Sequence, residues 1–238
     1  VGMPRAGSGW YYNLTHDLVT ASGGRDARQI RRSYHLGRVL TEVNCNIGAL
    51  TTPRLLAVLP PSLLGNTFAI KAHAGPTPFA LQLIRRGQLR AAYIYRDPRA
   101  ALLSAIEFGD RLRLKKKERA FTNLDTTEKS IAFMREYLGI WESWIAEPGV
   151  LVIRYEDMLV NYDAEIKRLL DFLDIHSENP GVISAIGRFR PGQADKDSQG
   201  LHFFQGKAER FRTALSPDQF TAFTETFKVH LERMGYTP

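Results

Sequence analysis

The first ten residues, VGMPRAGSGW, carry two glycines, Gly2 and Gly7, at the spacing of a phosphate-binding P-loop. A P-loop that hydrolyses nucleotides continues with Lys and then Ser or Thr, whereas Ser8 and Gly9 occupy those positions here. The cation of this loop, Arg5, lies inside it. Backbone N–H groups at the start of a helix can bind a phosphate without a metal ion. The loop therefore predicts a site for a phosphate-like anion that lacks the side chains for a magnesium-bridged triphosphate.

Three further groups of chemically active side chains lie at the ends of short apolar segments, 67–71, 91–95 and 150–154, which are expected to be strands. The groups are Lys71-Ala72-His73, Arg96-Asp97 and Tyr155-Glu156-Asp157. Ligands of open parallel sheets bind at the carboxyl ends of the strands. We therefore expect a histidine, several cations and a tyrosine to meet the glycine-rich loop at one edge of a sheet.

The elements that position these groups alternate between strand and helix. Helices are expected over 8–20, 78–86, 98–116, 126–146 and 164–173, and another after the N-cap Ser216. Strands that are apolar throughout are typical of parallel sheets covered on both faces. The predicted fold class is α/β, a three-layer α/β/α domain over residues 1–238 with a central, mainly parallel sheet. Only Val1, Gly2 and Met3 precede the loop, so we expect the first strand to be cut short.

The net charge of +7 is concentrated in one segment. Residues 85–119 contain eleven Lys and Arg against four Asp and Glu, which accounts for the whole excess. Such a segment is typical of a surface that binds an anionic partner, of a solvated basic helix face or of a surface that binds nucleic acid. Its cations over 111–119 would also suit an anionic acceptor such as a glycan.

The composition excludes several kinds of site. The single cysteine, Cys45, excludes an internal disulfide and a zinc site built from several cysteines. A reducing compartment is therefore expected, and with it a cytoplasmic location. The sequence has no run of eighteen apolar residues, so we expect no membrane-spanning segment in this chain.

Four motifs in order along residues 1–173 resemble those of sulfotransferases that use 3′-phosphoadenosine 5′-phosphosulfate (PAPS). The segment from Pro4 to Trp10 is similar to the 5′-phosphosulfate loop of that family. Tyr95-Arg96-Asp97-Pro98-Arg99, with Ser104 after it, resembles the 3′-phosphate motif. Ile70-Lys71-Ala72-His73 resembles the strand end that carries the catalytic histidine, and Arg154-Tyr155-Glu156-Asp157-Met158 resembles a further family segment.

The resemblance implies transfer of a sulfuryl group from PAPS to a hydroxyl or amine, with 3′-phosphoadenosine 5′-phosphate (PAP) as product and without a metal. In that interpretation His73 is the general base, and Lys71 and Arg5 neutralise the charge of the reacting groups. The implied donor-binding residues are Arg5, Ala6, Gly7, Ser8, Gly9, Trp10, Arg96, Ser104, Tyr155, Phe204, Gln205, Gly206 and Lys207.

The last of the family's motifs is altered in this chain. Phe204 and Gln205 replace two cations that normally hold the 3′-phosphate, while the glycine at Gly206 is kept. Lys207, together with Arg210 and Arg212, would be the nearest substitutes.

Two other functions remain open from the sequence. A P-loop small-molecule kinase would use Asp97 to bind magnesium, although this chain lacks the lysine that such a loop carries. A non-enzymatic nucleic-acid-binding module would use the basic segment 85–119 but lacks interleaved aromatic residues. For a sulfotransferase the expected partner is a small-molecule or glycan acceptor and not a nucleic acid. The walls of the acceptor site are expected from 25–66, 107–127 and 176–203.

Overall fold

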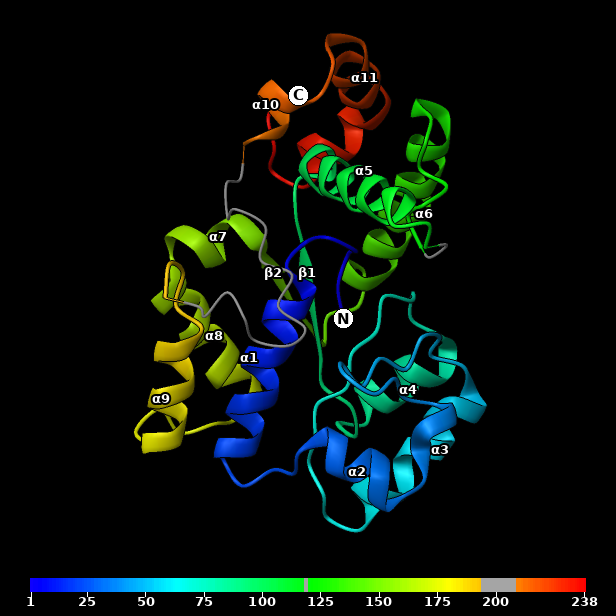
Figure 1. Ribbon diagram of the computed structural model, residues 1–238. Coiled ribbons are helices and arrows are strands. Elements are labelled where there is room, and N and C mark those ends of the chain that lie inside the picture. The colour runs from blue at the N-terminus through cyan, green and yellow to red at the C-terminus, as the bar shows by residue number, and fades with distance from the viewer. Residues whose placement is uncertain (118–119, 194–208) are drawn as a thin grey trace.

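The computed structural model describes residues 1–117, 120–193 and 209–238. Its first half contains α1 (Ser8–Ala21), α2 (Ala27–Ser33), the 3-10 helix η1 (Leu36–Arg38), α3 (Thr52–Leu63), α4 (Pro78–Arg85), β1 (Ala91–Tyr95) and α5 (Pro98–Leu114). Its second half contains α6 (Thr127–Ile145), β2 (Val150–Arg154), α7 (Tyr155–Val160), α8 (Tyr162–Leu173), α9 (Pro180–Arg188), α10 (Phe211–Ala214) and α11 (Pro217–Arg233). Helices surround the two strands, and α1 runs beside them (Figure 1).

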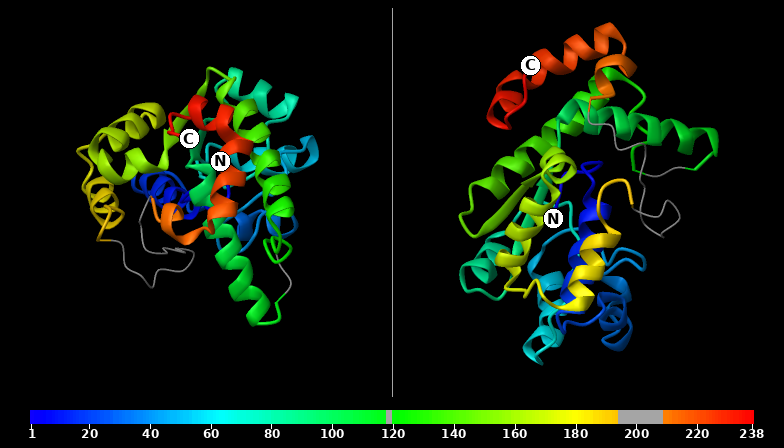
Figure 2. Two further views of the ribbon diagram at one scale, coloured as in Figure 1. Left: turned by 90° about the horizontal axis from the view of Figure 1, so that it is seen from above. Right: turned by 90° about the vertical axis from the view of Figure 1, so that its left-hand side faces the viewer.

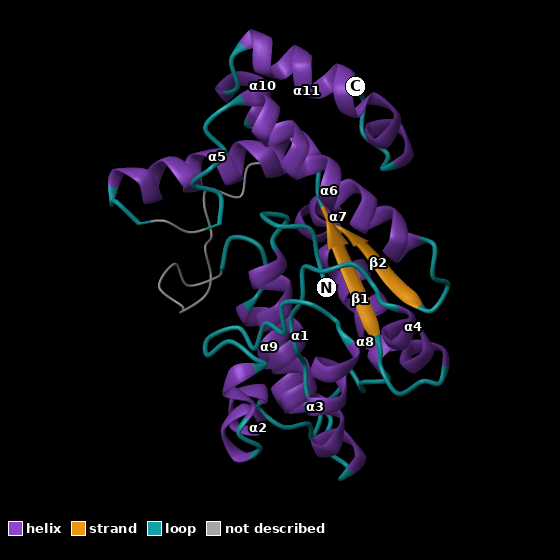
Figure 3. Ribbon diagram, turned by 90° about the vertical axis from the view of Figure 1, so that its right-hand side faces the viewer, coloured by secondary structure: helices purple, strands orange, loops and turns teal. Residues whose placement is uncertain are grey.

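The two strands lie side by side and run parallel, with Ala91 opposite Val150 and Tyr95 opposite Arg154 (Figure 3). Both strands have the predicted bounds. Because Tyr95 and Arg154 are partners, the next residues of both strands emerge next to each other at the carboxyl edge.

Isolated bridges extend this sheet beyond β1. Gly2 pairs in parallel with Ile94, and Asn46 pairs in parallel with Lys71. The Gly2 N–H donates to the Ala72 carbonyl at 3.2 Å, and the Met3 N–H donates to the Ile94 carbonyl at 3.0 Å. Residues 1–3 therefore lie between β1 and the 70–72 segment. The predicted strand over 67–71 is reduced to the bridge at Lys71, since residues 67–70 form no ladder.

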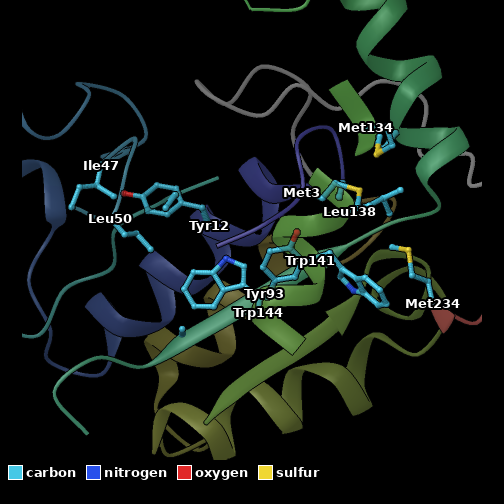
Figure 4. Close-up of a cluster of buried hydrophobic side chains, with 14 of the residues drawn as sticks. Met3, Tyr12, Ile47, Leu50, Tyr93, Met134, Leu138, Trp141, Trp144 and Met234 are labelled. Atoms are coloured by element: carbon cyan, nitrogen blue, oxygen red, sulfur yellow. The ribbon is translucent and has the colours of Figure 1, made fainter. Parts of the chain in front are cut away.

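Two hydrophobic clusters cover the two faces of the sheet, which gives the three layers predicted from the sequence. Side chains of successive strand residues point to opposite faces, and Tyr93 and Ile94 accordingly belong to different clusters. Tyr93 packs with residues of α6, including Trp141 and Trp144 (Figure 4). Ile94 packs with α1, α8 and α9. Both tryptophans of α6 are buried in this core.

Side-chain caps fix the starts of several helices. Thr77, Asp97, Thr126 and Ser216 each accept a hydrogen bond from a backbone N–H in the first turn of the helix that follows. The predicted N-cap at Ser216 is confirmed. The sequence did not predict α2, α3, α7, α9 or α10. Of these helices, α2, α7 and α10 are at most two turns long, α3 contains two internal prolines, and α9 contains Gly181 and Gly187, which disfavour a helix.

A buried ion pair joins the sheet to the helices above it. The Arg99 Nε and Nη2 atoms donate to the two carboxylate oxygens of Asp97 at 3.1 and 2.9 Å. Nη2 also donates to the Thr237 carbonyl at 2.7 Å, and Nη1 donates to the Thr224 hydroxyl at 3.3 Å. Arg99 thereby connects the start of α5 to α11 and the segment after it, and α11 packs on α5 and α6 (Figure 2).

We predict that Arg99→Leu lowers the free energy of unfolding by about 3–5 kcal/mol, because the substitution leaves the buried Asp97 carboxylate without its cation. Urea unfolding at pH 7 measures the change. Lys129→Leu is the control, since it breaks the solvent-exposed pair with Asp125 and should leave the unfolding midpoint in place. Equal losses in both variants would contradict the structural role of Arg99.

Candidate functional site

The glycine-rich loop depends on backbone conformations that few residues adopt. Gly7 is the N-cap of α1 with φ of 78°, and Arg5 also has a positive φ, 65°. A Cβ atom at Gly7 would lie 2.6 Å from Cδ2 of the Tyr155 ring. Only glycine therefore allows the loop to pass so close to Tyr155. The first N–H groups of a helix have no partners within it, so the start of α1 offers hydrogen-bond donors to an anion.

Arg5 reaches from this loop to α5. Its Nε donates to the Ser104 hydroxyl at 3.1 Å, and its guanidinium carbon lies 4.8 Å from the centre of the Phe108 ring. Burial, followed by the nearby charges of Arg111 and Arg96, lowers the pKa of Arg5 to about 10. Ser104, expected at the 3′-phosphate, thus contacts the cation of the 5′-phosphosulfate loop.

Lys71 and His73 lie at the end of the neighbouring row of the sheet. Burial, and then the charge of Arg5, lowers the pKa of the Lys71 ammonium to about 8. Burial, and then Lys71, lowers the pKa of the His73 imidazole to about 4. His73 is therefore neutral at pH 7. Both residues are held where the charged form of their side chains is disfavoured.

The tautomer of His73 follows from its contact with the loop strand. Its Nδ1 lies 2.6 Å from the carbonyl oxygen of Gly2. A carbonyl oxygen only accepts hydrogen bonds, so Nδ1 must carry the proton. In the neutral ring this leaves the lone pair on Nε2, which is the arrangement that a general base requires.

Arg96 and Tyr155 meet at the carboxyl edge because of the register of β1 and β2. The guanidinium carbon of Arg96 lies 4.6 Å from the centre of the Tyr155 ring. The Arg96 Nε is also 4.0 Å from Oε1 of Glu156. The sequence singles out Glu156 within the Tyr155-Glu156-Asp157 group but does not connect it with Arg96. Only the strand register in the structure, which places the residues after Tyr95 beside those after Arg154, makes that connection.

Trp10 is held by contacts within the protein. Its Nε1 donates to the Phe189 carbonyl at 3.0 Å, and its ring lies edge-on to Tyr155 with 6.2 Å between centroids. The other side of Trp10 stacks on Tyr162. The structure therefore brings Trp10 and Tyr155 into contact, as two residues near the same ligand would require.

The structure brings most of the predicted site residues together in one region at the carboxyl edge of the sheet. Ala6, Ser8 and Gly9 lie in the loop and the first turn of α1. Phe204, Gln205, Gly206 and Lys207 lie outside the described residues. Arg210, considered as a substitute cation, donates to both carboxylate oxygens of Glu107. Phe108 was not predicted as a site residue, and Arg111 was predicted only among the cations over 111–119 for an acceptor; the spacing of both from Ser104 along one face of α5 was the available signal.

Within residues 1–117, 120–193 and 209–238, no three His, Cys, Asp or Glu side chains gather in a way that could hold a metal ion. The expected independence from metal stays a prediction. No helix in the described part of the chain is both long and apolar enough to cross a membrane.

A parallel sheet with a glycine-rich loop and a group of cations at its carboxyl edge defines an α/β protein of the P-loop-like, anion-binding class. Residues 1–237 match the family model for the sulfotransferase domain, so the chain belongs to the sulfotransferase family. The resemblance of the four motifs is thereby confirmed at the level of the family.

Relatives and solved structures agree with this assignment. Sulfotransferase 6B1 of Danio rerio is 21% identical over 207 residues, which span 85% of this chain and 64% of that protein's length. The crystal structure of mouse sulfotransferase SULT7A1 complexed with PAP matches 97% of this chain and 81% of that chain, with 15% identity and a TM-score of 0.54. Retinol dehydratase in complex with androsterone and inactive cofactor PAP matches 97% of this chain and 79% of that chain, with 17% identity and a TM-score of 0.58. At these identities the two structures support the three-layer fold.

We predict that His73 makes the protein less stable as the pH falls. Its pKa of about 4 in the folded state lies below the ordinary 6.5, so the unfolded chain binds more protons between these values. Stability is therefore lost as the pH falls through 6.5, and the loss ends near pH 4. Between pH 7 and 5 the loss due to His73 should be about 2 kcal/mol.

Urea unfolding of the wild type and of His73→Asn at both pH values isolates this contribution, because asparagine does not titrate. The amide of asparagine can still donate to the Gly2 carbonyl. Parallel pH dependences of the two proteins would show that His73 is not held neutral.

Proposed function

We propose that this protein is a PAPS-dependent sulfotransferase that acts on a hydroxyl or amine of a small-molecule or glycan acceptor. The single observation that carries the proposal is a neutral His73, with its Nε2 lone pair, beside the crowded cations Arg5 and Lys71. A base beside cations is what transfer of an anionic group to a weakly acidic acceptor needs. Membership of the sulfotransferase family supports the same reaction.

The residues of the site fit a donor that carries several negative charges. Arg5 and Lys71 both have lowered pKa values, partly because like charges lie close together. An anion between them would relieve that repulsion and raise both pKa values. The cradle formed by Gly7 against Tyr155 brings the N-terminal N–H groups of α1 to the same place.

PAPS would supply an activated sulfuryl group, whose bond to the phosphate oxygen breaks as a bond to the acceptor oxygen or nitrogen forms. The Nε2 atom of His73 accepts the proton that the acceptor loses. Lys71 stabilises the negative charge on the sulfonate oxygens, and Arg5 with the loop N–H groups stabilises the charge that develops on the departing phosphate. The Gly2 carbonyl holds the imidazole in the tautomer that can accept this proton.

Arg96 and Tyr155 would bind the nucleotide part of the donor. A 3′-phosphate distinguishes PAPS from ordinary adenine nucleotides, and the partly buried guanidinium of Arg96 suits such a dianion. Tyr155 contacts both Arg96 and Trp10, so its ring lies among the residues that the family resemblance assigns to the nucleotide. Charge-assisted hydrogen bonds of this kind contribute about 1.5–3 kcal/mol each.

The alternative of a P-loop kinase has less support. Asp97, which would bind magnesium in a kinase, has its two carboxylate oxygens engaged by Arg99. The nucleic-acid-binding alternative is also weakened, because Arg96 and Arg99 of the basic segment point into the site and the core.

We predict that PAP stabilises the protein in the presence of EDTA, because its phosphates satisfy the cations of the site without a metal ion. At a PAP concentration a hundredfold above Kd the stabilisation should be about 2.7 kcal/mol. A thermal-shift series with PAP in EDTA and with Mg-ATP makes the measurement. A response to Mg-ATP alone would sink the proposal and favour the kinase.

We predict that His73→Ala lowers the single-turnover rate of sulfuryl transfer at pH 7 by about 10²–10⁴, while the Kd for PAP changes by less than about twofold. Lys71→Met should weaken both donor binding and transfer, because Lys71 carries charge in both states. The rates are measured with labelled PAPS and acceptors selected from phenols, alcohols, amines and glycans. Transfer at the wild-type rate by the His73 variant would exclude this residue as the base.

A further inference from the structure

Residues beside Arg96 and Tyr155 at the strand ends contact the segment 234–237, which follows α11. The Tyr95 hydroxyl lies 3.4 Å from the Met234 carbonyl, and Arg154 Nη1 lies 3.4 Å from the Gly235 carbonyl. The Arg99 Nη2 donates to the Thr237 carbonyl at 2.7 Å. Residues next to the proposed ligand-binding side chains therefore contact three backbone carbonyls of one short segment.

Tyr236 is the side chain of this segment that enters the contact. It is buried, its ring lies edge-on to Tyr95 at 6.3 Å, and the Arg154 guanidinium carbon lies 4.6 Å from its centre. Its hydroxyl donates to Oε2 of Glu156 at 2.7 Å. Burial, and then the Glu156 carboxylate, raises the pKa of Tyr236 far above its usual value, so the hydroxyl keeps its proton.

Glu156 joins this segment to Arg96. Its Oε2 accepts from Tyr236 and lies 3.6 Å from Arg154 Nε. Its Oε1 lies 3.4 Å from the backbone nitrogen of Asp97 and 4.0 Å from Arg96 Nε. A carboxylate restrained on both oxygens has one orientation, and the guanidinium beside it is restrained in turn.

We propose that Glu156, fixed by Tyr236, is a positioning residue that orients Arg96 toward the 3′-phosphate of the donor. The inference rests on the proposed function for the identity of the ligand. It adds that a segment 80 residues beyond Glu156 in the sequence sets the selectivity for a 3′-phosphorylated nucleotide. Glu156 and Tyr236 act only through Arg96 and do not touch the donor.

The physical reason is the cost of ordering an arginine side chain. A free arginine loses about 2 kcal/mol of rotamer entropy when a ligand fixes it. Glu156 and Tyr155 hold the Arg96 side chain in advance, from its edge and from its face respectively. A ligand that pairs with a side chain already in place binds more tightly, because less ordering remains to be done.

The test compares PAP with adenosine 5′-phosphate, which lacks only the 3′-phosphate, by calorimetry on the whole chain. Tyr236→Phe removes one hydroxyl and keeps the ring in place. It should weaken PAP binding about five- to tenfold and adenosine 5′-phosphate binding less than twofold. Glu156→Gln is the second variant, with the same selective loss expected. Tyr34→Phe is the matched control, because its hydroxyl bonds to Asn66 near α2, and it should leave both affinities unchanged.

A double-mutant cycle with Arg96→Ala separates positioning from a general structural effect. In the Arg96→Ala background, Tyr236→Phe and Glu156→Gln should cause no further loss of PAP affinity, because the residue through which they act is gone. Equal losses for both nucleotides, or additive losses in that background, would overturn the inference while leaving the proposed function intact. A wild-type protein that does not distinguish PAP from adenosine 5′-phosphate would overturn both.

Discussion

The site depends on one piece of backbone, the row formed by Val1, Gly2 and Met3 between β1 and the 70–72 segment. Its hydrogen bonds to Ala72 and Ile94 fix its register against the neighbouring rows, and therefore the point at which the glycine-rich loop leaves the sheet. Gly2 pairs in parallel with β1, and β1 pairs in parallel with β2, so the carboxyl ends of these three rows share one edge, and the hydrogen bond from Gly2 to Ala72 brings the 70–72 segment beside them. The glycine-rich loop, the histidine and the two cationic strand ends therefore meet without any long-range side-chain contact being needed to assemble them. The Gly2 carbonyl also orients His73, so the same row that positions the loop selects the tautomer of the proposed base.

Positive charge in this region is handled in two different ways. Arg99 and Arg96 lie beside carboxylates, Asp97 and Glu156, which come from the same two strand ends. Lys71, by contrast, has a depressed pKa caused first by burial and then by Arg5. Charges that are compensated within the protein hold the framework, whereas charges that crowd each other raise the free energy of the ligand-free site. An anionic ligand lowers that free energy, which makes the crowding a source of binding selectivity.

The position of the loop cation separates this site from that of a nucleotide-hydrolysing P-loop. With Ser8 and Gly9 after Gly7, the start of α1 keeps its N–H groups but lacks the usual lysine. Arg5 enters from within the loop and packs over Phe108 of α5. The Arg5 charge therefore lies between the loop and α5, next to Ser104, and in the proposed reaction the sulfuryl group would occupy the side of the site that faces Lys71 and His73.

The sequence by itself determined the bounds of both strands, the main helices, the three-layer class and the family, because apolar runs, caps and the glycine-rich loop are local signals. It also determined that the loop, Lys71, His73, Arg96 and Tyr155 share an edge, since parallel strands leave no other arrangement. It did not reveal α2, α7 and α10, which are at most two turns long, or α3 and α9, which contain internal prolines or glycines. Only the tertiary structure decided that Ser104 contacts Arg5 and that Tyr236 holds Glu156 beside Arg96. These pairs are separated by about a hundred residues or by eighty, and contacts at such distances depend on how whole helices pack, which no local pattern of residues encodes.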